Sequence, residues 1–133
     1  MKNLRFLTTL TAIVLLNASF RSESEITERI RSIIKSGNAH ELAVHFDRKL
    51  ELVIDTEKID FHNIENSHAE LILKGFFKKH PPKAFTYIYQ GSADRMRYST
   101  ATYNTSTDAF EVYILMRKSK NDYVINTLHF RKE

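Results

Sequence analysis

The chain has 133 residues, a formal net charge of +4 and no cysteine. Without cysteine the fold must be held by its hydrophobic core alone, and both a lipid-accepting cysteine and a cysteine nucleophile are excluded. Once the N-terminal segment described next is set aside, about 110 residues remain, which is enough for one hydrophobic core and too few for two.

Residues 1–22 have the order of a signal peptide. A basic start, Met1 to Arg5, precedes an apolar run from Phe6 to Leu16 and the small residues Ala18 and Ser19. The apolar run is shorter than the roughly 20 residues that span a bilayer. We therefore expect cleavage, export to the periplasm or the extracellular space, and no stable membrane anchor afterwards; the alternative is a buried N-terminal helix.

The positive charge belongs mostly to this segment. Removing it takes away Lys2, Arg5 and Arg21 and no acidic residue, so the net charge falls from +4 to about +1. Lys78 and Lys79 lie where a helix is expected to end, and there they complement the helix dipole. We therefore expect no nucleic-acid partner.

Two short helices are predicted at the start of the mature chain. Ser22 or Ser24 caps the first and Gly37 ends it. The apolar side chains at helical spacing in between are Ile26, Ile30, Ile33 and Ile34. A capping box from Asn38 to Glu41 begins the second, whose apolar face is Ala39, Leu42, Ala43 and Phe46.

A hairpin and a longer helix are predicted next. Residues 49–54 alternate as a half-buried strand does, and residues 58–62 offer a shorter partner. A capping box from Ser67 to Glu70 begins the helix, Gly75 inside it suggests a close approach by another segment, and two prolines end it. Its apolar positions are Ala69, Ile72, Leu73, Phe76 and Phe77.

Only strands fit the sequence from Lys83 onward. Apolar and polar residues alternate between short polar turns, which predicts an antiparallel meander. The expected rows are Phe85, Tyr87 and Tyr89; Met96, Tyr98, Thr100 and Thr102; and Phe110, Val112, Ile114 and Met116. On the last strand two rows compete for the inner face: Tyr123, Ile125, Thr127 and His129, or Val124, Leu128 and Phe130.

The order of these elements resembles the cone fold of the nuclear-transport-factor-two-like, or cystatin-like, superfamily over residues 24–133. Leu73-Lys74-Gly75-Phe76-Phe77-Lys78-Lys79-His80-Pro81-Pro82 and Tyr123-Val124-Ile125-Asn126-Thr127-Leu128-His129-Phe130 resemble, more specifically, a secreted bacterial family labelled as a domain of unknown function. The resemblance implies a single α+β domain over residues 23–133, with N-terminal helices on a strongly curved antiparallel sheet. It also implies a cavity between the third helix and the sheet, and dimerisation through the outer sheet face. It implies no reaction.

The residues themselves offer no convergent catalytic set. Glu51 and Glu111 alternate out of phase with the apolar rows and should point to solvent. The histidines are not spaced as in a His-Glu-x-x-His metal motif, although His62, Glu65 and His68 could meet if their loop folded back. We therefore expect no cofactor and no metal.

The sequence favours a non-enzymatic, exported binding or interaction domain. It would hold a small apolar ligand in the cone or dock a protein partner, with a homodimer as one form. The residues expected to line the pocket are Phe76, Tyr87, Tyr113 and His129. The alternative is a small lyase or isomerase that uses an acid and a histidine in the pocket.

Overall fold

The computed structural model describes residues 25–133, so the expected signal peptide and the serine caps of the first helix lie outside the described residues. The chain divides into two compact units, residues 1–32 and residues 33–133. Residues 25–32 of the first unit are helical and carry an ion pair of 2.7 Å between Arg31 Nη2 and Glu28 Oε2.

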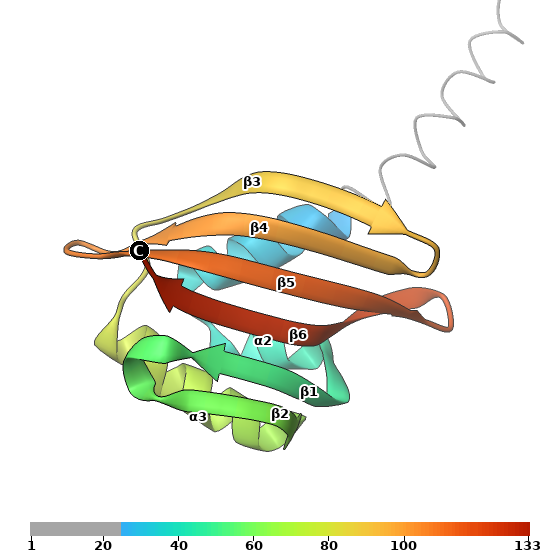
Figure 1. Cartoon of the computed structure of the whole chain (residues 1–133), viewed down its shortest axis with the longest axis horizontal. Helices are drawn as coiled ribbons and strands as arrows, with labels where there is room; N and C mark the ends of the chain where they lie inside the picture. The colour runs from blue at the N-terminus through green and yellow to red at the C-terminus, as the bar shows by residue number, and fades with distance from the viewer. Residues whose placement is uncertain (1–24) are drawn as a thin grey trace, which may run out of the picture. The chain divides into compact units, whose positions relative to one another are not determined.

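The second unit is built on a curved six-stranded sheet (Figure 1). The spatial order is β2-β1-β6-β5-β4-β3, and every neighbouring pair is antiparallel except β1 and β6, which are parallel. The last strand of the chain therefore lies inside the sheet. The strands are β1 (Phe46–Ile54), β2 (Ile59–Glu65), β3 (Ala84–Ala93), β4 (Met96–Asn104), β5 (Ala109–Ser119) and β6 (Asp122–Lys132).

The turn before α2 (Ala39–Val44) confirms two of the expected signals. Gly37 has φ +69°, and its N–H donates to the carbonyl of Ile34. The Asn38 side chain accepts a hydrogen bond from the backbone N–H of Glu41. Phe46, however, does not belong to the helix: it is the first residue of β1, buried and paired with Ile125.

Helix α3 (Asn66–Lys79) has the expected apolar face but not the expected start. The helix begins at Asn66, and its cap residue Glu65 makes no side-chain capping bond, so the predicted box at Ser67 does not form. The close approach expected at Gly75 is also wrong, because a Cβ there would meet nothing within 4 Å. Leu73, Phe76 and Phe77 are buried as expected.

Two bulges on the C-terminal strands decide which of their side chains share a face of the sheet. The register of β3 against β4 shifts between Tyr87 and Tyr89, which places these two residues on opposite faces. The register of β5 against β6 shifts between Leu115 and Met116, and Asn126 is the residue skipped. Ile125 therefore joins Leu128 and Phe130 on the inner face, and neither expected row of β6 survives intact.

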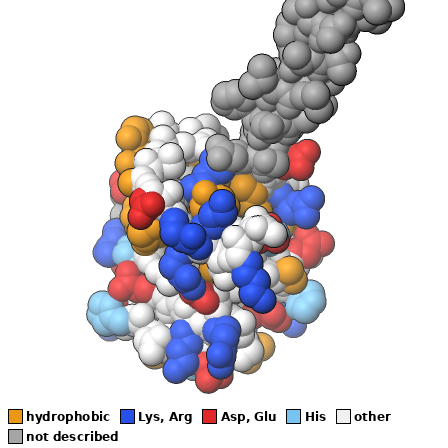
Figure 2. All heavy atoms as spheres, turned by 90° about the vertical axis from the view of Figure 1, so that its right-hand side faces the viewer, with side chains coloured by type: hydrophobic (Ala, Val, Ile, Leu, Met, Phe, Trp, Pro, Cys, Tyr) orange, Lys and Arg blue, Asp and Glu red, His pale blue; other side chains and the backbone are white. Residues whose placement is uncertain are grey.

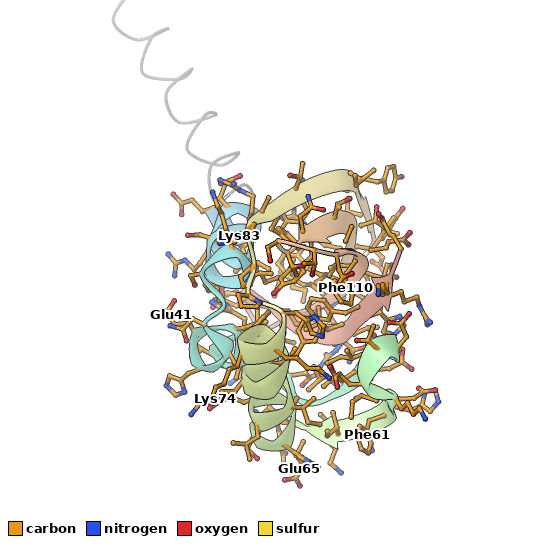
Figure 3. The ribbon with its side chains drawn as sticks, turned by 90° about the vertical axis from the view of Figure 1, so that its left-hand side faces the viewer. Glu41, Phe61, Glu65, Lys74, Lys83 and Phe110 are labelled. Carbon is orange, nitrogen blue, oxygen red and sulfur yellow. The ribbon has the colours of Figure 1, made fainter. Side chains whose placement is uncertain are left out.

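The inner face of the sheet and α3 enclose a core of aromatic rings that meet at a tilt or edge to face. The ring of Phe76 lies 4.7 Å from that of Phe130, 5.3 Å from that of Phe110 and 5.8 Å from that of Tyr103. All four rings are at most 2% exposed. Figure 3 shows α3 on one side of the sheet, with Phe110 directed from β5 into the space between. These rings occupy the place where the cone resemblance implies a cavity.

Within residues 25–133 no helix has both the length and the apolar character needed to cross a membrane.

Candidate functional site

The open face is the face of the sheet opposite α3, and no helix of residues 33–133 covers it (Figure 1). Tyr89, Tyr98 and Tyr113 lie on this face on three successive strands and form what we name the tyrosine strip. The rings of Tyr89 and Tyr98 are 6.0 Å apart. Tyr98 also lies over Gly91, where a Cβ would come within 2.5 Å of its ring. The glycine thus allows the ring to lie flat on the strand.

Beside the tyrosine strip, one carboxylate joins two imidazoles from neighbouring strands. Glu51 of β1 lies 2.7 Å from His62 Nδ1 of β2 through Oε1 and 2.7 Å from His129 Nε2 of β6 through Oε2. We name these three residues the imidazole bridge. Asp60 is 3.8 Å from His62, and the Tyr113 ring is 5.8 Å from that of His129. The tyrosine strip and the imidazole bridge are therefore continuous across the open face.

The electrostatics of the imidazole bridge favour the ionised form of Glu51 and the protonated form of His62. The hydrogen bonds from His62 and then from His129 hold the pKa of Glu51 below its ordinary value. The hydrogen bond to Glu51, together with the charge of Asp60, raises the pKa of His62. A carboxylate that acts as a general base at neutral pH needs the opposite shift, upward by desolvation.

We expect Glu51→Gln to lower the stability of the protein most between pH of about 4.5 and 6.5. A lowered Glu51 pKa contributes stability above its ordinary value of 4.5, and this is lost as the pH falls through the folded pKa. A raised His62 pKa contributes stability below 6.5, and this is lost as the pH rises through the folded pKa. Urea unfolding of both proteins at pH 3, 5.5 and 9 measures the difference.

The matched control is Glu111→Gln, because Glu111 is exposed on the same face. The loss of stability caused by Glu111→Gln should show no maximum between those pH values. A stability difference for Glu51→Gln that grew steadily up to pH 9 would contradict the assignment of the bridge as a pair of opposite charges.

The four residues expected to line one pocket lie on two faces. Phe76 and Tyr87 are on the inner side, where Phe76 belongs to the aromatic core and the Tyr87 ring contacts that of Phe85 at 5.2 Å. Tyr113 and His129 are paired with each other on the open face. The structure thus brings the second pair together and separates it from the first.

A second acid and imidazole meet at the rim of the aromatic core. Glu57 lies in the short 3-10 helix Asp55–Glu57, and its Oε1 is 3.3 Å from His80 Nε2. The same oxygen is 3.2 Å from Lys79 Nζ. The His80 ring packs 5.0 Å from that of Phe76 and 5.3 Å from that of Phe110. This contact could not be predicted from the pattern of residues, because the partners are 23 residues apart.

Two hollows are described on the surface of the second unit, and both lie away from these groups. One of about 510 Å³ is lined by Ser36, Gly37, Asn38, Ala39, His40, Glu70 and Lys74. The other, of about 190 Å³, is lined by Arg48, Lys49, Glu65 and Asn66. Among the described residues no group of three or more His, Cys, Asp or Glu side chains is placed to hold a metal ion.

The sequence model of a family described as a domain of unknown function (DUF4783) matches residues 27–131. The chain belongs to the DUF4783 family. The resemblance noted from the two sequence strings is thereby confirmed. A comparison of the DUF4783 chain with the curated proteins gives no match.

Solved structures agree with this assignment. A DUF4783 protein of Bacteroides uniformis is 26% identical, with a TM-score of 0.73 over 80% of this chain and 95% of its own. One of Bacteroides fragilis is 25% identical, with a TM-score of 0.72 over 78% of this chain and 95% of its own. An NTF2-like protein of unknown function from Silicibacter pomeroyi is 8% identical, with a TM-score of 0.66 over 89% and 98%. This likeness shows the fold alone, so the DUF4783 chain has the NTF2-like α+β fold expected from the order of its elements.

Proposed function

We propose that this protein is an exported, non-enzymatic binding domain that takes an amphipathic partner on the open face of its sheet. The single observation that carries the proposal is the continuity of the tyrosine strip with the imidazole bridge. Tyrosine offers apolar area with a polar tip and is enriched where proteins bind partners. Export rests on the sequence of residues 1–22.

Two features support binding over chemistry. The interior between α3 and the sheet is filled by the rings of Phe76, Tyr103, Phe110 and Phe130, so an apolar ligand has little room there. The half-buried carboxylate of Glu51 is hydrogen-bonded to its two imidazole partners and has a lowered pKa, which makes it a weak base. The open face therefore carries polar groups suited to recognition.

The test uses the fluorescent probe 8-anilinonaphthalene-1-sulfonate, an aromatic amphiphile. We expect the probe to bind the purified exported protein and to lose most of its binding in Leu115→Glu, since Leu115 lies on the open face next to Tyr98. The matched control is Leu71→Glu, because Leu71 is 66% exposed on α3 and away from this face. Equal probe binding by both variants would contradict the proposal.

Candidate ligands then follow from displacement of the probe. Amphipathic compounds that displace the probe and raise the melting temperature of the unsubstituted protein, but not of Leu115→Glu, are ligands of the open face. If no compound of a broad metabolite panel does so, small-molecule binding loses its support and a protein partner remains.

The second candidate function is a small lyase or isomerase, and the contact between Glu57 and His80 is the observation that favours it. Lys79 competes for the same carboxylate oxygen, and neither of the two described hollows includes this pair. We therefore rank this function second. Turnover of any compound in the panel, abolished by Glu57→Gln, would reverse the ranking.

A further inference from the structure

Strand β3 is an edge of the sheet that is protected neither by charge nor by proline, although it carries the bulge at Ile88. Within residues 33–133 it pairs only with β4. Its ten residues, Ala84 to Ala93, include no charged side chain and no proline. Natural sheets usually protect long edges with charges, prolines or a covering segment, because free backbone N–H and C=O groups invite another strand.

The opposite edge shows the protection that β3 lacks. Strand β2 is shorter, with seven residues, and it carries Asp60, His62 and Glu65. Pairing of β2 with its own copy would bring carboxylates of the two copies close together, which is unfavourable. Of the two edge strands, β3 is therefore better suited than β2 to pair with a strand of another chain.

The most exposed large side chains of β3 are also largely apolar and lie in the middle of the strand. Ile88 is 68% exposed and Tyr89 is 56% exposed, and they are adjacent in the middle of the strand. The run Phe85-Thr86-Tyr87-Ile88-Tyr89-Gln90 combines β-branched and aromatic residues without charge, which is the composition of segments that pair readily as strands.

We propose that two copies of the chain pair antiparallel through their β3 edges, about a two-fold axis between Ile88 and Tyr89. A second copy is the occupant that charge favours, because an uncharged strand meets no like charge on its own copy. The bulge sets the register: it puts Tyr87 and Tyr89 on opposite faces, and paired strands place residues of the same face opposite one another. An axis between Ile88 and Tyr89 meets this condition and pairs the whole strand, with Ala84 opposite Ala93 and Tyr87 opposite Gln90 of the second copy.

This pairing has a consequence for the open face. It joins the two sheets into one of twelve strands and brings the Tyr89 side chains of the copies to neighbouring strands, so the two tyrosine strips become continuous. The inference does not depend on the proposed function, because the edge can pair whatever the open face binds.

The first experiment measures association of the protein purified after export, by sedimentation equilibrium. We expect a dimer, and we expect Ile88→Lys to raise its dissociation constant at least tenfold. Leu71→Lys is the control, since Leu71 is 66% exposed on α3. A monomer throughout the concentration range, or equal effects of the two substitutions, overturns the proposal.

The second experiment locates the contact by cross-linking and does not depend on the lysine variant folding. The chain has no cysteine, so a single introduced cysteine reports one position. The two copies of Ile88 flank the axis, one residue out of direct register, which puts their Cα atoms about 6 Å apart and within the range of a disulfide. We expect Ile88→Cys to form a disulfide-linked dimer under mild oxidation, and Leu71→Cys and Leu115→Cys to stay monomeric on denaturing gels. Faster cross-linking of Leu115→Cys places the contact on the open face and overturns the proposal.

Discussion

Replacing Phe76 by alanine is expected to lower the free energy of unfolding by about 3–5 kcal/mol. Phe76 is 2% exposed and contacts the rings of Tyr103, Phe110 and Phe130, which come from three different strands. Its removal leaves a cavity that the surrounding rings cannot fill without leaving their rotamers. Urea unfolding followed by circular dichroism measures the loss.

Leu71→Ala is the matched control, because Leu71 lies on the same helix and is 66% exposed. Its effect should stay within about 0.5 kcal/mol. If both substitutions cost the same, α3 would not be the cover of the sheet, and the filled interior on which the proposed function relies would be wrong.

Replacing Tyr103 by phenylalanine is expected to cost about 1–3 kcal/mol although it removes a single oxygen. The Tyr103 hydroxyl donates to the backbone carbonyl of His80 at 2.5 Å, and the side chain is 0% exposed. Without this donor the carbonyl at the end of α3 loses its partner away from water. Thermal unfolding measures the effect, with Tyr89→Phe as the control since Tyr89 is 56% exposed.

The same tyrosine gives a second, independent readout. Burial raises the pKa of Tyr103 well above the ordinary value of 10.0. Tyr103 should therefore remain unionised in an alkaline absorbance titration until the protein unfolds, and Tyr103→Phe should remove that late step. A titration in which all tyrosines ionise together in the folded protein would contradict the burial of this hydroxyl.

The sequence was sufficient to predict most helices and strands of the fold, but not which face of the sheet each side chain occupies. Periodicity was enough to find α3 and the four C-terminal strands, because both signals come from residues near one another in sequence. The bulges at Ile88 and Asn126 carry no such signal, and one extra residue moves every later side chain to the other face. This is why Tyr87 and Tyr89 separate and why the inner row of β6 mixes the two expected ones.

The candidate site was harder to predict, for a related reason. The contact between Glu51 and His62 follows from the hairpin of β1 and β2, since the two residues are 11 apart and nearly opposite. His129 is 78 residues from Glu51, and only the parallel pairing of β1 with β6 brings it near. A pattern of hydrophobic residues predicts that strands exist, and it says little about which distant strands become neighbours.

That parallel pairing also bears on the order of assembly. The hairpin of β1 and β2 leaves the ribosome early, whereas β6, the strand it needs on its other side, is made last. The β1 edge stays unsatisfied until the C-terminus arrives and closes a loop of more than half the chain, which makes folding slow relative to proteins with local contacts. A nascent or truncated chain therefore exposes the unpaired edge of β1 and is prone to aggregate unless a chaperone binds it.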